Sequence, residues 1–111
     1  MEVTTQKFKQ CDLITVKGRV DSATAAQLGE ALEAITKGGR YKIVFDMSDV
    51  EYMSSAGMRV LLSTQKECKR LNRGEVVLAV VSDRIKEALD LAGFIPLFTI
   101  LDEVTPAVGY F

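Results

Sequence analysis

The chain has 111 residues, a net charge of −1 and no histidine. The length is that of one domain, and the near-neutral charge provides no overall field that would attract nucleic acid or anionic lipid. The absence of histidine excludes Ser-His-Asp and Cys-His catalysis, and it removes the most common metal ligand.

The first third of the chain predicts two strands followed by a helix. Val3–Phe8 and Leu13–Val20 read as strands with apolar and polar residues on opposite faces. The short polar segment between them predicts a hairpin, so we expect these two strands to be antiparallel. The Asp21-Ser22 pair offers an N-cap for a helix that ends at Gly38-Gly39.

Strands and helices alternate through the rest of the chain. Its clearest strand signal is an unbroken apolar run, which is typical of a buried strand. In chain order we expect a strand at Ile43–Met47, a helix from Ser54-Ser55 to Gly74, the apolar strand Val76–Val81, a helix from Ser82-Asp83 to Gly93, a strand at Leu97–Leu101, and a short helix or tail at Asp102–Tyr110.

This order predicts one α/β domain over residues 1–111. Strands separated by helices are connected by right-handed parallel crossovers. We therefore expect a small mixed β-sheet with an antiparallel first pair and mainly parallel remaining strands. Partner and ligand sites gather at the carboxyl ends of such parallel strands. Three segments rich in aspartate and serine are expected to share that edge: Asp21-Ser22, Asp46–Gly57 and Ser82-Asp83.

Ser54 and Ser55 lie where the second helix is predicted to begin, a typical place for an N-cap. Capping is compatible with a signalling role. A phosphate on such a serine would meet free backbone N–H groups and would add about −1.5 to −2 charges. Gly57 either leaves room for a partner's backbone or permits tight helix–sheet packing.

Three segments together resemble the STAS domain family, and in particular the bacterial anti-sigma factor antagonists. The signature stretch is Phe45–Leu62, which contains the sequence Met53-Ser54-Ser55-Ala56-Gly57. Gly18–Ala25 and Ala88–Phe94 fit the same family. The likeness spans nearly the whole chain and implies the fold of that family.

The resemblance also implies a phosphorylation-controlled partner switch. The unphosphorylated protein would bind an anti-sigma factor serine kinase and so release a sigma factor. The kinase would phosphorylate one serine, binding would be lost, and a serine phosphatase would reset the cycle. Alignment on Gly57 places the acceptor at Ser55. Ser54 is the alternative, because better-known members carry an acid there. The partner-binding residues implied are Asp21, Ser22, Asp46, Ser54, Ser55, Ala56, Gly57 and Met58.

Several of these residues have structural explanations as well. Asp21 can contact the partner or position the acceptor, or it can cap a helix, and both remain open. The Asp-x-Ser pattern at Asp46 favours a turn at a strand end. A basic stripe on the second helix can dock an acidic partner, but a solvated face is the more common explanation. Its members are Arg59, Lys66, Arg70 and Arg73.

Other functions fit less well. Met53–Gly57 lacks the leading glycine of a G-x-S-x-G nucleophile elbow. Neither phosphate-binding glycine motif is present, which leaves at most weak nucleotide binding. A STAS scaffold in a stress-signalling complex, or an accessory subunit of a transporter, is the alternative within the family.

We expect no catalytic residue, metal or cofactor, and no direct contact with nucleic acid or membrane. Cys11 and Cys68 match no metal spacing and are expected to be reduced thiols, with Cys68 in the core. With neither a signal peptide nor an apolar run long enough to span a bilayer, the sequence predicts a cytoplasmic protein. We expect a monomer or a weak dimer.

Overall fold

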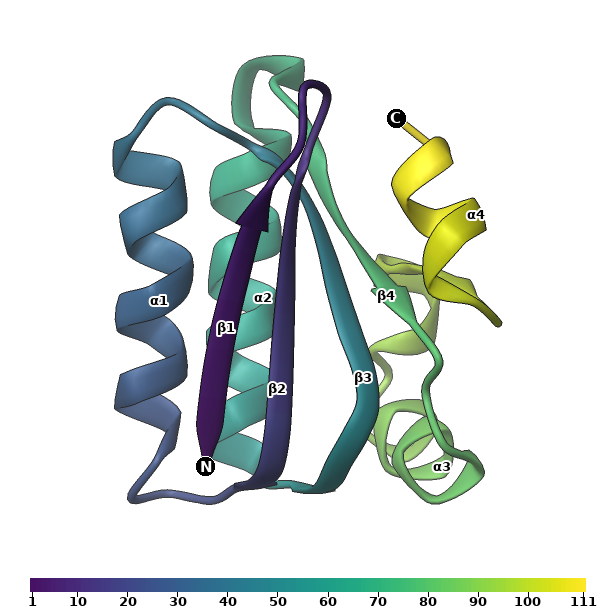
Figure 1. Cartoon of the computed structure of the whole chain (residues 1–111). Coiled ribbons are helices and arrows are strands. Elements are labelled where there is room, and N and C mark those ends of the chain that lie inside the picture. The colour runs from purple at the N-terminus through teal and green to yellow at the C-terminus, as the bar shows by residue number, and fades with distance from the viewer.

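The computed structural model describes all 111 residues. Its elements follow the predicted order, as Figure 1 shows: β1 (Glu2–Lys7), β2 (Asp12–Val20), α1 (Ala25–Lys37), β3 (Lys42–Met53), α2 (Ser55–Lys69), β4 (Glu75–Ala79), α3 (Asp83–Leu91), β5 (Thr99–Leu101) and α4 (Val104–Gly109). Short 3₁₀ turns, Arg70–Asn72 and Ile95–Leu97, follow α2 and α3. The segment Asp102–Tyr110, predicted as a short helix or tail, contains the helix α4.

The five strands form one sheet in the order β1-β2-β3-β4-β5. β1 pairs with β2 antiparallel, and every other pair is parallel. The predicted mixed sheet is confirmed. Each parallel pair is joined through a helix, because a chain that re-enters a sheet in the same direction must cross over its face.

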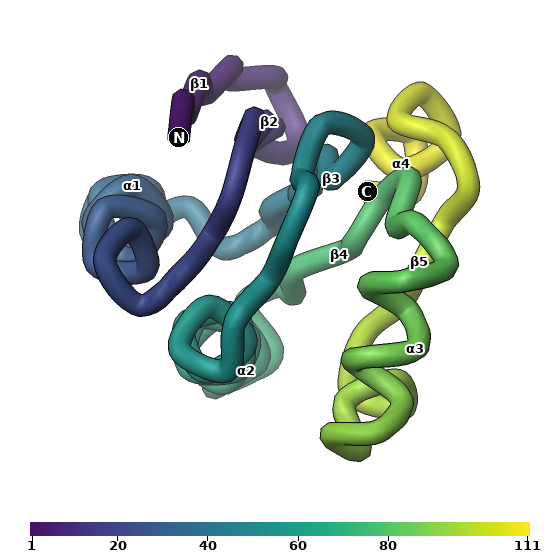
Figure 2. The backbone as a smooth tube through the Cα atoms, turned by 90° about the horizontal axis from the view of Figure 1, so that it is seen from below, coloured from purple at the N-terminus to yellow at the C-terminus, as the bar shows by residue number.

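The helices divide unequally between the two faces of the sheet. Figure 2 shows α1, α2 and α3 on one face and α4 on the other. The main core lies under the first three helices and contains 21 buried residues. In α1 the inward positions are Leu28, Leu32 and Ile35, at the spacing that places side chains on one helical face. A smaller core under α4 joins Val44, Val77 and Ala107.

β3 is longer than predicted. The sequence indicated a strand over Ile43–Met47, but pairing with β2 continues to Met53. The register between β2 and β3 shifts twice along this stretch, which is the signature of β-bulges. The extra residues interrupt strict alternation while Val50 and Met53 still face the core. Because of these bulges, the second half of the strand lacks the alternating pattern by which a strand is predicted from sequence.

The end of α2 also differs from the prediction. The helix ends at Lys69 rather than at Gly74, and Leu71, which follows it, is 80% exposed. Leu71 and Asn72 adopt φ values of 59° and 54°, which breaks the helical path. A Cβ on Gly74 would lie 2.6 Å from the backbone carbon of Tyr41. The chain must leave the helix early in order to pass this close to the start of β3.

The last strands are shorter than predicted. β4 ends at Ala79 rather than Val81, because Val80 turns to a φ of 58° while its N–H donates to the Leu101 carbonyl oxygen at 2.9 Å. β5 begins at Thr99, since Pro96 lies in the preceding 3₁₀ turn. No helix of the structure is both long and apolar enough to cross a membrane.

Candidate functional site

The carboxyl ends of β2 and β3 meet at one point of the sheet edge. Val20 lies opposite Met53 in the parallel register. Ser54, the first residue after β3, donates its backbone N–H to the Val20 carbonyl oxygen at 2.8 Å. The Asp21-Ser22 turn and the start of α2 are therefore neighbours, as the sequence predicted for two of the three segments.

The two serines at this edge have different surroundings. Ser54 is the N-cap of α2, and its Oγ accepts a hydrogen bond from the Gly57 N–H at 3.2 Å. Ser54 is half-buried. Ser55 is the first residue of the helix, it is exposed, and its hydroxyl makes no hydrogen bond within the chain. The capping role falls to Ser54, which leaves the Ser55 hydroxyl accessible.

Gly57 and Met58 are buried between the first turn of α2 and the sheet, and they do not form the surface of this edge. A Cβ on Gly57 would lie 2.7 Å from Val20 Cγ1 and closer still to Met53 Sδ, distances that real Cβ atoms do not show. Only glycine lets the first turn of α2 lie this close to the ends of β2 and β3. Met58 is buried in the main core. Both residues pack against the sheet, which agrees with the packing alternative for Gly57, and contact of either residue with a partner stays a prediction.

Asp21 caps the turn that leads into α1. One carboxylate oxygen accepts hydrogen bonds from the N–H groups of Ala23 and Thr24, both at 2.9 Å, and from Thr24 Oγ1 at 3.1 Å. The hydrogen bonds from Thr24, followed by weaker contributions from Ala23 and the Arg19 charge, hold the pKa of Asp21 below its usual range. The N-cap of α1 itself is Thr24, so Asp21 caps the turn before the helix, and its carboxylate stays charged beside the exposed Ser22.

Asp46 does not lie at the edge that holds Ser55. It lies within β3, opposite Thr15 of β2 and Ala79 of β4, and β3 runs on to Met53. Its Oδ1 accepts the Ser48 N–H at 3.0 Å, as the Asp-x-Ser pattern predicted, although at a bulge rather than a strand end. The expected strand end at Asp46 is therefore wrong, whereas contact of Asp46 with a partner stays a prediction.

The third predicted segment caps another helix. Ser82 is the N-cap of α3, and its Oγ accepts the Ile85 N–H at 3.3 Å. β4 ends opposite Asp46, whereas β2 and β3 continue farther. The Ser82-Asp83 segment therefore leaves the sheet at a different height from the Asp21-Ser22 turn and the start of α2.

An exposed aromatic–cation pair flanks the edge on the face opposite α2. Tyr52 is 40% exposed, and the Arg19 guanidinium lies 4.5 Å from its ring centroid. The two residues are register partners, directly before Val20 and Met53. The sequence pattern does not reveal this pair, because the pairing of Arg19 with Tyr52 depends on the second bulge between the strands.

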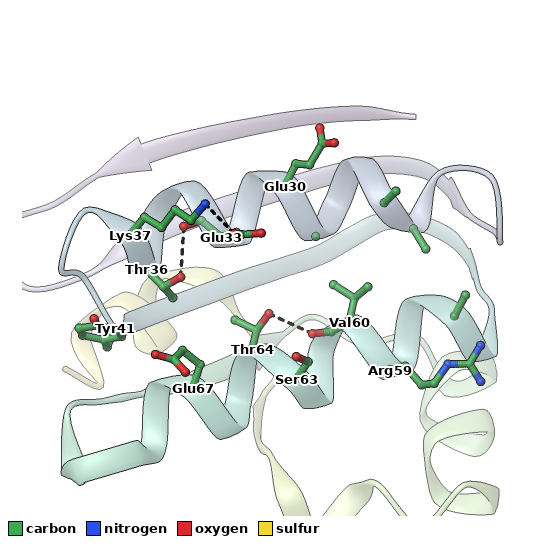
Figure 3. Close-up of a pocket in the computed structure, with 14 residues that line it drawn as sticks. Glu30, Glu33, Thr36, Lys37, Tyr41, Arg59, Val60, Ser63, Thr64 and Glu67 are labelled. Atoms are coloured by element: carbon green, nitrogen blue, oxygen red, sulfur yellow. Dashed lines mark hydrogen bonds and ion pairs between the residues drawn. The ribbon is translucent and has the colours of Figure 1, made fainter.

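A groove of about 900 Å³ runs between α1 and α2, with its wide opening to solvent (Figure 3). Small residues such as Ala25, Gly29 and Ala56 line it, together with charged side chains. At one end Lys37 pairs with Glu33 at 2.7 Å, and at the other end Arg59 makes no ion pair. Because Ala56 and Arg59 belong to the first turns of α2, the groove adjoins the exposed Ser55.

The basic stripe predicted on the second helix divides into parts. Arg73 lies beyond the helix, where it pairs with Glu67 at 2.8 Å and its guanidinium lies 3.7 Å from the Tyr41 ring centroid. Arg70 lies in the 3₁₀ turn, while Arg59 and Lys66 are exposed along α2. Only Arg59 and Lys66 of the four therefore lie on the helix itself.

Both cysteines are buried. Cys68 lies in the main core, as expected, and burial followed by the Glu67 charge raises its pKa to about 11. Burial and the neighbouring Asp12 also raise the pKa of Cys11. The structure holds no group of three or more histidine, cysteine, aspartate or glutamate residues placed to bind a metal ion.

Comparison with known proteins gives consistent matches. The STAS domain profile matches residues 2–107. A Bordetella bronchiseptica protein, BtrV, named for a proposed role as an anti-sigma factor antagonist, is 31% identical over 111 residues, which is all of this chain and 95% of that protein. The anti-sigma-B factor antagonist of Staphylococcus aureus is 32% identical over 94 residues, covering 84% of this chain and 83% of that one. The phosphorylated form of the Bacillus cell-fate determinant SpoIIAA superposes with a TM-score of 0.76 at 16% identity, covering 98% of each chain.

Proposed function

The chain belongs to the STAS domain family, and from this membership we propose that it acts as an anti-sigma factor antagonist. In its unphosphorylated form it binds an anti-sigma factor that is also a serine kinase, and it thereby releases a sigma factor. It works by binding and not by catalysis, in the cytoplasm where sigma factors act. The names of its relatives in Bordetella and Staphylococcus support this role.

We propose Ser55 as the acceptor of the phosphoryl group. The observation that carries this assignment is the difference between the two serines. The Ser54 hydroxyl caps α2, whereas the Ser55 hydroxyl is exposed and has no partner in the chain. A kinase can reach Ser55 without opening the helix. The phosphoryl group passes from ATP to the Ser55 oxygen with release of ADP and the hydroxyl proton. A separate serine phosphatase then hydrolyses the phosphoserine to serine and inorganic phosphate.

The loss of binding has an electrostatic cause in this proposal. A partner that covers the edge formed by Ser22, Ser55 and Ala56 also covers the charged carboxylate of Asp21. A neutral hydroxyl is tolerated in such an interface. A phosphate that is desolvated beside a carboxylate costs several kcal/mol, and about 1.4 kcal/mol already lowers affinity tenfold. Gly57 and Met58 contribute by holding the first turn of α2 against the sheet.

The proposal is tested by binding measurements with the anti-sigma kinase that phosphorylates this protein. Phosphopeptide mass spectrometry after incubation with kinase and ATP is expected to locate one phosphate, on Ser55. Ser55→Ala is expected to bind the kinase like the wild type, and Ser55→Asp to bind at least tenfold more weakly. Ser54→Ala is the matched control, which keeps the acceptor. Equal binding of Ser55→Ala and Ser55→Asp, together with modification elsewhere, would show that Ser55 is not the switch.

A further inference from the structure

Arg59 is the only charged residue in the first two turns of α2. It follows Ser55 by four positions, which is one helical turn. Its side chain is exposed and makes no ion pair or hydrogen bond within the chain. A long cationic side chain is thus unpaired next to the proposed phosphorylation site.

The geometry of the helix directs Arg59 toward Ser55. Side chains at positions i and i+4 lie on the same face of a helix, and Cα–Cβ bonds lean toward the helix amino terminus. Figure 3 shows the Arg59 guanidinium extending in that direction, along α2 toward its amino-terminal end. An anion placed four residues before a cation is the favourable order for such a pair. A phosphate on Ser55 is therefore within reach of this guanidinium.

Arg59 also lies at the end of the groove between α1 and α2. Besides Arg59, four charged residues line that groove, and three of them have partners: Lys37 pairs with Glu33, and Glu67 pairs with Arg73. Glu30 is the remaining one, and it is an acid. Arg59 is consequently the only cation of the groove that is free to bind an incoming anionic group.

We propose that Arg59 binds two anions in alternation. When Ser55 is unmodified, the guanidinium receives a carboxylate of the anti-sigma partner, whose segment enters the groove at this end. When Ser55 is phosphorylated, the phosphate on Ser55 binds the Arg59 guanidinium instead. This inference rests on the proposed function, and it adds a second cause of release: phosphorylation both introduces a repulsive charge and removes the contact at Arg59.

The competition favours the phosphate for two reasons. A guanidinium binds phosphate through two parallel hydrogen bonds, which is among the strongest charge-assisted arrangements. The phosphate is also tethered one turn away, so its effective concentration is far above that of a carboxylate on a separate protein. Phosphorylation of Ser55 therefore displaces the partner's carboxylate from the Arg59 guanidinium.

The intramolecular contact can be tested without any kinase. Phosphoserine is placed at position 55 during translation, and the phosphate is titrated by phosphorus NMR. The midpoint of its second ionisation is expected at lower pH in the wild type than in Arg59→Gln, with Arg59→Lys in between, because a nearby cation stabilises the dianion. Arg84→Gln, which removes an exposed arginine from α3, is the matched control and is expected to match the wild type. Equal midpoints in the wild type and Arg59→Gln would overturn the proposal.

The partner contact is tested with the anti-sigma kinase and unmodified Ser55. Arg59→Gln is expected to bind about tenfold more weakly than the wild type, and Arg84→Gln to bind like it. If Arg59→Gln binds like the wild type while phosphorylation still abolishes binding, the role of Arg59 is wrong and the proposed function stands. If phosphorylation of Ser55 leaves the affinity unchanged, both are wrong.

Discussion

The backbone N–H of Ser54 donates a hydrogen bond to the carbonyl oxygen of Val20, across a distance of 2.8 Å. This contact ties the end of β2 to the N-cap of α2. It fixes the Asp21-Ser22 turn beside the first turn of α2, and it leaves Ser55 on the outside. The accessible serine is thus held by backbone pairing between two strands, so substitutions of its side chain are expected to leave the edge intact.

The two serines are expected to differ in how much their replacement by alanine destabilises the protein. Ser54→Ala removes the N-cap hydrogen bond to Gly57, and we expect a loss of about 1 kcal/mol in the free energy of unfolding. Ser55→Ala removes no contact and is expected to stay within about 0.5 kcal/mol of the wild type. Urea denaturation followed by circular dichroism measures both. A larger loss at Ser55 than at Ser54 would contradict the assignment of the cap.

Gly57→Ala is expected to destabilise the protein, although alanine is the better helix former. Its Cβ would overlap Met53 and Val20, so the first turn of α2 must move away from the sheet, at a cost of about 1–3 kcal/mol. Gly29→Ala in α1 is the matched control. There the new Cβ would meet Val60 at an ordinary 3.7 Å, and a gain of about 0.5–1 kcal/mol is expected. Equal effects at both glycines, measured by thermal unfolding, would argue against close packing at Gly57.

Gln65 is expected to be the most sensitive polar residue of α2. It is 3% exposed, its Oε1 accepts the Val76 N–H, and its Nε2 donates to the carbonyl oxygens of Val76 and Leu97 at 3.2 and 2.8 Å. Gln65→Leu leaves these backbone groups without a side-chain partner, so a loss of about 2–3 kcal/mol is expected. Thr64→Val removes only a bond to a carbonyl of its own helix and is expected to cost less than about 1 kcal/mol.

Asp21 is expected to stabilise the fold near neutral pH and to lose this effect at low pH. Because hydrogen bonds from Thr24 lower its folded pKa, the carboxylate stabilises the fold above its unfolded pKa of about 3.9. That contribution is lost as pH falls through the lower folded pKa. Carbon-detected NMR titration is expected to give a lower midpoint for Asp21 in the wild type than in Thr24→Val. An unchanged midpoint would mean that the cap does not bind the charged form.

Neither cysteine is expected to react in the folded protein. Cys11 is 1% exposed and Cys68 fully buried, and their raised pKa values keep both as thiols near neutral pH. Alkylation at about pH 8 should therefore follow unfolding, with no fast phase. Mass spectrometry of the native protein after a short exposure to iodoacetamide measures this, and labelling of either residue within minutes would contradict the burial.

The sequence determined the order of the elements, the mixed sheet and the location of Ser54 and Ser55 at the start of the second long helix. These features follow from local signals. Val76–Ala79 is apolar because the strand is buried on both faces, and Ser54 and Ser82 precede helices because their hydroxyl groups cap them. Local periodicity failed where the backbone departs from regular geometry, at the bulges after Asp46 and at the left-handed turn of Leu71.

Tertiary structure alone decided which residues of the signature reach the surface. The sequence motif groups Asp46, Gly57 and Met58 with Ser55. In the fold, β3 continues past Asp46, and the packing of α2 on the sheet buries Gly57 and Met58. Contacts between distant segments could not be predicted from the sequence either. Examples are the hydrogen bond of Gln65 to Leu97, the Arg40–Asp12 ion pair, and the position of Arg59 at the groove between α1 and α2. The physical reason is that capping and periodicity act within one turn or one strand, whereas burial and pairing depend on which segments the fold brings together.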